Sequence, residues 1–98
     1  MNVIFDDDDL DRLELDPSYT NGHSANVVKA FRKLIQAIRS ATDERDLRQM
    51  KSFRLEKLKG KRQQQHSMRL NDQYRLIVIL ETVDGAKQVR IVSIEDYH

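Results

Sequence analysis

The 98-residue sequence predicts an α+β fold, in which two or three N-terminal helices pack on a small, twisted antiparallel sheet. Apolar side chains over residues 27–38 alternate steps of four and three, which is the spacing of one helix face. Residues 74–80 form the most apolar run and are typical of a central strand with both faces covered. The order of one strand, helices and then strands joined by short turns favours antiparallel pairing, but parallel pairing of the first strand stays open.

The first half of the chain supplies an edge strand and two helices. Residues 1–5 are short and apolar, as an edge strand would be. The acidic run 6–9 offers caps for a short helix that stops before Pro17, or else an acidic surface that mimics or repels nucleic acid. Asn21 and Gly22 predict a turn, after which Ser24 or Asn26 caps the main helix. Its polar positions are expected to form a solvated back face: Lys29, Arg32, Lys33, Gln36 and Arg39.

The second half supplies the remaining strands. Thr42 is expected to cap a short helix that ends near Met50. Alternating apolar residues over 52–58 predict a strand or an extended arm, and the alternation resumes over 66–70 after a polar loop. Turns at 71–72 and 82–85 separate the central strand from its neighbours, and residues 88–94 form the last strand.

Length and composition limit the classes of protein. A chain of 98 residues is expected to be one domain, residues 1–98. The absence of cysteine excludes disulfides, thiol nucleophiles and Cys-ligated zinc, and it fits the reducing cytoplasm. The acidic N-terminus and the absence of a long apolar run argue against a signal peptide or a membrane-spanning segment.

The net charge of +1 conceals a strong asymmetry along the chain. Residues 1–16 hold seven acidic residues against one arginine, whereas residues 51–69 hold seven basic residues against one glutamate. This distribution indicates an anionic partner for the middle of the chain, of which nucleic acid is the commonest, unless the charges only form a solvated face.

Several side chains are suited to chemistry. Arg75 lies one residue inside the predicted central strand, where a rigid guanidinium can bind phosphate through its fork of donors. The terminal segment 95–98 brings a carboxylate, a phenol and an imidazole to the end of the last strand, although a terminal histidine is more often frayed than catalytic. His23 and His66 have no partners at ligand spacing and are expected at the surface.

Three linked segments resemble the HigB branch of the RelE/ParE toxin superfamily, over about half of the chain. They are Leu55-Glu56-Lys57-Leu58-Lys59-Gly60 with Lys61-Arg62, then Ser67-Met68-Arg69-Leu70-Asn71-Asp72-Gln73-Tyr74-Arg75, and finally Glu95-Asp96-Tyr97-His98. The resemblance implies the RelE-like microbial RNase fold and ribosome-dependent cleavage of mRNA in the cytoplasm. It also implies a HigA-like helix-turn-helix antitoxin as the partner, with DNA contacted only through that antitoxin complex.

The resemblance assigns a catalytic group. Lys59 and Arg75 would neutralise the scissile phosphate, because charge concentrates on the phosphorus during attack by the 2′-hydroxyl. His98 would transfer a proton, Tyr97 would stack on a splayed base, and Asp96 would orient a partner or act as the base. The resemblance implies no metal, organic cofactor or membrane contact.

Two further expectations follow from the same motifs. Glu56 stands where some members of the family place a catalytic histidine, so either Glu56 substitutes for it or the chemistry relies on Asp96 and His98. Four basic residues would contact the backbone of ribosomal RNA without sequence preference: Lys57, Lys61, Arg62 and Arg69.

Two other functions stay open at this point. A non-enzymatic topoisomerase inhibitor of the ParE type would have no evident need for the terminal group together with Lys59 and Arg75. A pure interaction module would act only as a co-repressor with its antitoxin.

Overall fold

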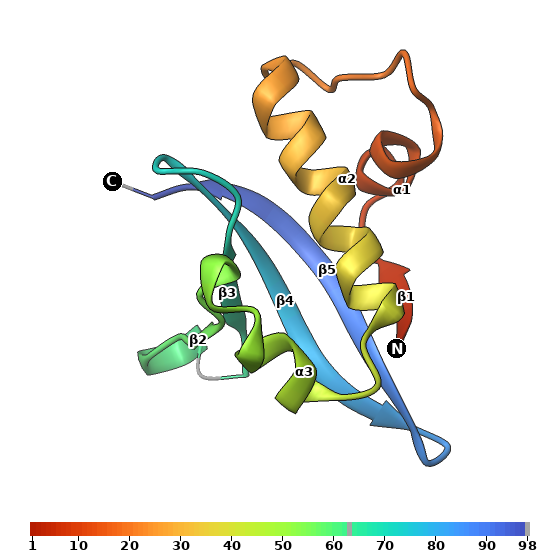
Figure 1. Ribbon diagram of the computed structural model, residues 1–98, viewed down its shortest axis with the longest axis vertical. Helices are drawn as coiled ribbons and strands as arrows, with labels where there is room; N and C mark the ends of the chain where they lie inside the picture. Colours follow the sequence, from red (N-terminus) through yellow and green to blue (C-terminus); the bar gives the residue numbers. More distant parts are fainter. Residues whose placement is uncertain (63, 98) are drawn as a thin grey trace.

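The computed structural model describes residues 1–62 and 64–97, which form a five-stranded sheet and three α-helices (Figure 1). In chain order the elements are β1 (Asn2–Phe5), α1 (Asp8–Leu15), α2 (Ala25–Ser40), α3 (Glu44–Gln49), the 3-10 turn η1 (Lys51–Phe53), β2 (Glu56–Lys57), the 3-10 turn η2 (Gly60–Arg62), β3 (His66–Arg69), β4 (Tyr74–Val83) and β5 (Ala86–Asp96). The strand order is β1-β5-β4-β3-β2, with β1 parallel to β5 and the other pairs antiparallel. The α+β prediction is confirmed, and the parallel pairing left open is the one adopted by β1.

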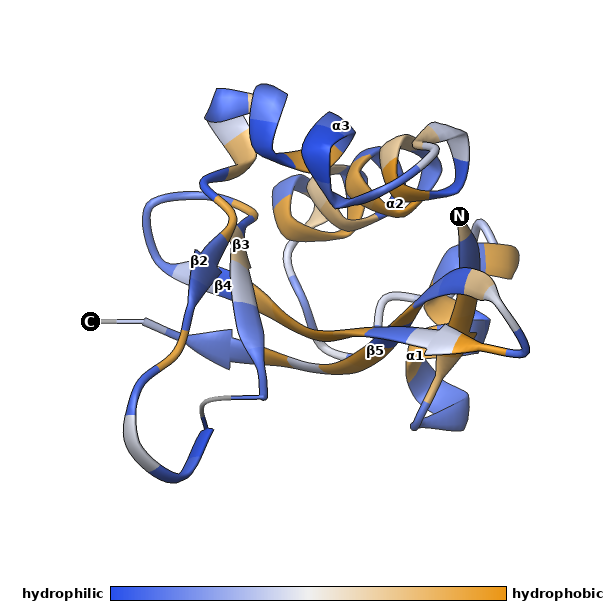
Figure 2. Ribbon diagram, turned by 90° about the horizontal axis from the view of Figure 1, so that it is seen from below, coloured by the Kyte–Doolittle hydropathy of each residue, from blue (hydrophilic) through white to orange (hydrophobic). Residues whose placement is uncertain are grey.

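The hydrophobic core lies between α2 and one face of the sheet (Figure 2). On α2 the predicted stripe is buried, with Phe31, Leu34 and Ile38 at 0% exposure. On the sheet, alternate residues of β4 point into the same core, including Leu76 and Val78. Within the described chain, no helix is long and apolar enough to cross a membrane.

The intervening residues of β4 point to the opposite face, away from α2. Ile77 is buried there at 1% exposure but is not part of the helix-side core. A register shift between Ile77 and Val78 leaves one extra residue on β5, which is the signature of a β-bulge. The bulge keeps Ile91 and Ile94, on either side of it, packed against the core.

The acidic run at the start of the chain begins α1, as the helix-capping interpretation predicts. The Asp7 carboxylate accepts a hydrogen bond from the backbone N–H of Asp9 at 2.7 Å. Asp6 forms an ion pair with Arg90 of β5 at 2.7 Å. The Asp9 carboxylate accepts a hydrogen bond from the Tyr19 hydroxyl at 2.9 Å. These acids therefore have structural partners within the domain.

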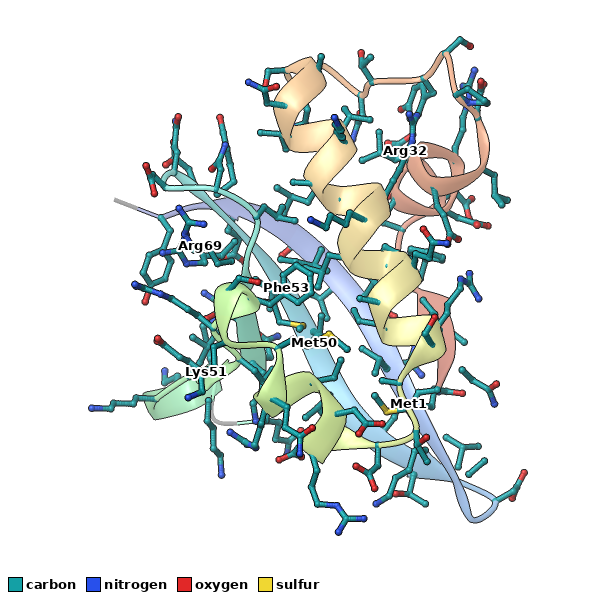
Figure 3. The ribbon with its side chains drawn as sticks, viewed as in Figure 1. Met1, Arg32, Met50, Lys51, Phe53 and Arg69 are labelled. Atoms are coloured by element: carbon teal, nitrogen blue, oxygen red, sulfur yellow. The ribbon has the colours of Figure 1, made fainter. Side chains whose placement is uncertain are left out.

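The prediction of a solvated back face on α2 is wrong for Arg32. Its guanidinium donates to the backbone carbonyls of Leu13 at 3.0 Å, Asp16 at 2.8 Å and Tyr19 at 3.3 Å (Figure 3). The carbonyls at the C-terminal end of a helix lack intrahelical partners, and Arg32 supplies donors to them. Arg39 is exposed but forms a bidentate ion pair with Glu14, so it is not a freely solvated charge either.

Two predictions about the middle of the chain are also corrected. Asp43, not Thr42, caps α3, because the Asp43 carboxylate accepts from the backbone N–H of Arg45 at 2.9 Å. Residues 52–58 do not form one extended strand. Phe53 belongs to η1 and packs against the core, and Arg54 then adopts the left-handed conformation with φ 46° and ψ 62°. This turn reduces β2 to two residues.

Candidate active site

A row of three side chains crosses the sheet on the face away from α2. The register places Arg69 of β3 opposite Arg75 of β4, and Arg75 opposite Glu95 of β5. Each of the three alternates with a residue packed in or against the core, so the row lies on the opposite face. The predicted phosphate-binding arginine is thus held on the middle strand of the sheet.

Arg75 is half-buried and fixed from two sides. Its Nη1 donates to the carbonyls of Asn71 at 2.7 Å and Tyr74 at 3.2 Å. Its guanidinium lies over the ring of Tyr97, 4.9 Å from the ring centroid, which is a cation–π contact. Nε and Nη2 make no hydrogen bond to any of residues 1–62 and 64–97. Two nitrogens of an oriented guanidinium, Nε and Nη2, therefore remain to donate to a ligand.

The end of β5 is tied to the turn that precedes β4. The backbone N–H of Tyr97 donates to the carbonyl of Gln73 at 2.6 Å. The Gln73 side-chain amide donates to the Asp96 carboxylate at 3.1 Å. Strand alternation puts Asp96 on the opposite side of β5 from Glu95. His98, the predicted proton-transfer residue, lies outside the described residues.

Glu95 binds Arg62 across the open face. Arg62 donates to both oxygens of the Glu95 carboxylate at 2.9 and 2.7 Å, and the Ser93 hydroxyl donates to Glu95 at 3.0 Å. The hydrogen bond from Arg62 lowers the pKa of Glu95 below its ordinary value, although partial burial opposes the shift. The connection between β2 and β3 is thereby joined to β5, on the side of the sheet away from α2 and α3 (Figure 2).

A family model for HigB-like toxins, the RelE-like toxins of type II toxin-antitoxin systems, matches residues 3–97. The chain belongs to this family. The solved structures that resemble this HigB-like toxin include a YoeB/ParE toxin from Agrobacterium tumefaciens, with 16% identity, a TM-score of 0.64 and coverage of 100% of both chains. The YoeB-YefM complex from Staphylococcus aureus gives 23% identity and a TM-score of 0.60, covering 100% of this chain and 97% of that one.

The YoeB dimer from Staphylococcus aureus is a third similar structure, with 24% identity, a TM-score of 0.56 and coverage of 100% of this chain and 97% of that one. At these identities the structural likeness shows a shared fold. The comparison with curated proteins found no significant match.

The structure of the HigB-like toxin gathers part of the predicted site. Arg75 lies opposite Arg69 in the sheet and over the ring of Tyr97, and Arg62 pairs with Glu95, which lies opposite Arg75 on β5. Both predicted RNA-binding arginines already have acidic partners, since Arg62 pairs with Glu95 and Arg69 pairs with Asp72. A phosphate must therefore compete with a carboxylate at either one.

The predicted lysines lie at the end of β2, which contains Lys57, and on the connection between β2 and β3, which contains Lys59 and Lys61. Lys57, Lys59 and Lys61 are exposed, and none forms an ion pair within the described part of the chain. Lys59 directly precedes Gly60, whose φ of 70° turns the chain into η2. Arg75 lies on β4, so the two predicted phosphate ligands come from different segments.

Glu56 is more distant from the phosphate-binding arginine than Arg69 is. The register puts Glu56 opposite Ser67, which in turn lies opposite Ile77. This row is adjacent to the row of Arg69, Arg75 and Glu95. Glu56 lines a hollow of ≈ 340 Å³ together with Arg48, Lys51, Arg54 and Leu55, and this hollow shares Lys51 and Arg54 with the one that contains Arg75.

Sequence reasoning missed two cations and misplaced a histidine. Lys51 and Arg54 line a hollow with Arg75, although only their membership of the basic segment 51–69 pointed to them. His66 was expected at the surface, but its Nδ1 is buried without a hydrogen-bond partner among the described groups. Burial lowers the pKa of His66, because the charged imidazolium loses hydration.

Chemically, this arrangement can bind an anion and a planar ring side by side. Arg75 offers fixed positive charge and directed donors, which are suited to an oxyanion. Tyr97 is exposed at 48% and presents an aromatic surface at the same point. Phosphate next to a base is the repeating chemistry of a nucleic acid strand.

Proposed function

We propose that this type II toxin is a ribosome-dependent endoribonuclease that cleaves mRNA in the ribosomal A site and so inhibits translation. The observation that carries the proposal is Arg75, whose guanidinium is oriented by two carbonyls and Tyr97 and retains free donors. Membership of the HigB-like family supports it. The site of action would be the cytoplasm, where ribosomes translate mRNA.

The reaction would be an intramolecular transesterification at a phosphodiester of the RNA strand. The 2′-oxygen loses its proton and attacks the neighbouring phosphorus, and the bond to the 5′-oxygen breaks as that oxygen gains a proton. Asp96 would orient its partners or take the first proton, with Glu56 as the alternative base, and His98 would be the main proton-transfer residue. Arg75 and Lys59 would stabilise the charge that develops on the phosphate. Tyr97 would stack on a base splayed from the strand.

The remaining basic residues would bind ribosomal RNA and mRNA. Lys57, Lys61, Arg62 and Arg69 would contact RNA phosphates, and the binding would weaken as salt rises. Every protein group in this scheme is a side chain of the toxin, so the proposed reaction requires no metal or organic cofactor.

We infer that the toxin is neutralised by an antitoxin of the HigA-like, helix-turn-helix class. The family is defined by type II toxin-antitoxin systems, and one structure of the same fold is a YoeB-YefM complex. Contact with operator DNA would then pass through the antitoxin.

Primer extension on mRNA from cells that express the toxin tests the proposal. Cuts should appear on translated messages and should fall by at least about a hundredfold in Arg75→Ala, because one preorganised donor to a developing oxyanion is worth that much. His98→Ala should also abolish cutting. Arg45→Ala is the matched control, since Arg45 is exposed on α3 and paired with Asp43.

Each variant is first checked for folding by circular dichroism. Unchanged cutting of mRNA by folded Arg75→Ala and His98→Ala variants would contradict the assignment of these residues to the active site. Inhibition of gyrase supercoiling by the purified toxin, with no cuts in translated mRNA, would instead favour the topoisomerase inhibitor.

A further inference from the structure

A cationic hollow lies beside Arg75, between η1 and the turn that joins β3 to β4. Its volume is ≈ 450 Å³, and it is lined by Lys51, Ser52, Arg54, Arg69, Asp72 and Arg75. Asp72 is the one acidic residue among them, and it is paired with Arg69. Figure 3 shows Lys51 and Arg69 on the same side of the molecule. The hollow therefore carries excess positive charge next to the candidate phosphate ligand.

Two of these cations lack the acidic partners that most arginines of this chain have. Seven arginines form ion pairs within the described residues: Arg12, Arg39, Arg45, Arg48, Arg62, Arg69 and Arg90. The side chains of Lys51 and Arg54, by contrast, form neither an ion pair nor a hydrogen bond to the described part of the chain. Both residues are exposed. An incoming anion would not have to displace a carboxylate from either of them.

The backbone of Arg54 is in a conformation that arginine rarely adopts. Its φ of 46° lies in the left-handed region, where the Cβ atom approaches the following carbonyl oxygen. The other non-glycine residues with positive φ among residues 1–62 and 64–97 are Asn21 and Asp84. Their short polar side chains adopt this region readily, and each precedes a glycine in a turn. A glycine at position 54 would adopt this backbone conformation without strain. The presence of arginine instead points to a role for its side chain.

We propose that Lys51 and Arg54 bind a backbone phosphate of single-stranded RNA next to the phosphate that Arg75 contacts. The inference rests on the proposed function in so far as Arg75 holds RNA. The hollow is open and larger than one phosphate group, which suits a strand passing through it. The Ser52 hydroxyl adds a neutral donor. These groups read charge rather than base edges, so the subsite would have no sequence preference.

The test uses the purified full chain and a fluorescein-labelled ten-nucleotide RNA, with binding followed by anisotropy between 50 and 200 mM salt. Arg54→Gly removes the charge and the backbone strain together. Loss of one phosphate contact should weaken binding at 50 mM salt roughly five- to tenfold and reduce the slope of log K against log salt by about 0.7. Lys51→Gln should give a similar loss without changing the backbone.

Two control variants separate charge from strain. Arg54→Lys keeps the charge and the strained backbone, and it should bind within about twofold of the wild type, because the contact is electrostatic. Asp84→Gly relaxes a left-handed residue in the distant β4–β5 turn and should leave binding unchanged. Melting temperature is measured for every variant. Arg54→Gly should melt no lower than the wild type, since glycine removes the strain.

The outcomes also separate this inference from the proposed function. Normal binding by both Arg54→Gly and Lys51→Gln would overturn the subsite, even if the toxin cuts mRNA on ribosomes. Absence of binding by the wild type, or an equal loss in Asp84→Gly, would also overturn it. Weakened binding in the two subsite variants would support the subsite even if no cutting is found.

Discussion

Replacing Arg32 by alanine would remove the side chain that joins α2 to the end of α1. Its Nε and Nη2 donate to the carbonyls of Leu13, Asp16 and Tyr19. A hydrogen bond from a charged group contributes about 1.5–3 kcal/mol net. Two nitrogens serve the three carbonyls, the contact to Tyr19 is the longest, and water can reach part of the space. We therefore expect a loss of about 2–3 kcal/mol, not the sum of three full bonds.

That loss is large for a domain of this size. A chain of 98 residues has an unfolding free energy of roughly 5–15 kcal/mol, and each kcal/mol shifts its melting temperature by about 4–8 °C. Arg32→Ala should therefore melt roughly 10–20 °C below the wild type. Urea unfolding should show a lower midpoint with an unchanged slope, because the surface exposed on unfolding stays the same.

Two variants on the same helix make this result specific. Arg32→Lys should recover less than half of the loss, since one ammonium cannot reproduce the planar fork that reaches three carbonyls. Arg39→Ala removes a bidentate pair between the exposed Arg39 and Glu14, whose side chain is 15% exposed, and should lower stability by about 1 kcal/mol. If Arg32→Ala is within about 0.5 kcal/mol of the wild type, or is no worse than Arg39→Ala, the reasoning is refuted.

Two pH effects follow from the shifted groups. The pKa of His66 is lowered by burial, so its contribution to stability is present above the unfolded value near pH 6.5 and is lost as the pH falls through the lower, folded value. Urea midpoints between about pH 7 and 5 should thus fall less in His66→Gln than in the wild type, and parallel curves would contradict this. The pKa of Glu95 is lowered by Arg62, so their pair stabilises the fold above the unfolded carboxyl value near 4.3 and stops doing so as the pH falls through the folded value. Glu95→Gln should therefore lower stability by less than about 1 kcal/mol at pH 7 and by nothing at pH 2, as measured by thermal melts, whereas an equal loss at both values would exclude an ionic origin.

The parts of the fold that sequence patterns predict well are those in which burial alone decides the structure. Helix α2 has a complete apolar stripe, and β4 has too many consecutive aliphatic residues for any exposed element. Residues 52–58 show the limit of this reasoning. Phe53 and Leu55 fit the alternation of a strand, yet both pack against the core around a left-handed Arg54. The identity of an arginine carries no signal for that conformation.

Only some residues of the candidate site could be predicted from the sequence. Arg75 and Tyr97 could be assigned to one site because both belong to motifs of a recognisable family, and the structure places the guanidinium over the ring. The burial of the His66 ring could not be predicted from sequence, since it depends on which segments cover β3. The distance between Arg75 and the Lys59 segment likewise depends on the path of a loop, which hydrophobic patterning does not determine.

Pairing, rather than the number of charges, determines which basic residues can bind an anion first. The segment 51–69 contains seven basic residues, but Arg62 and Arg69 are already neutralised by Glu95 and Asp72. Glu95 lies 33 positions from Arg62, so no local charge pattern could reveal that pair. A phosphate that reached Arg62 would have to displace Glu95, which would detach the β2–β3 connection from β5. Within the described chain five basic residues of this segment form no ion pair: Lys51, Arg54, Lys57, Lys59 and Lys61. Of these, Lys51 and Arg54 line the hollow that contains Arg75, and for this reason the proposed first contact with RNA lies beside η1.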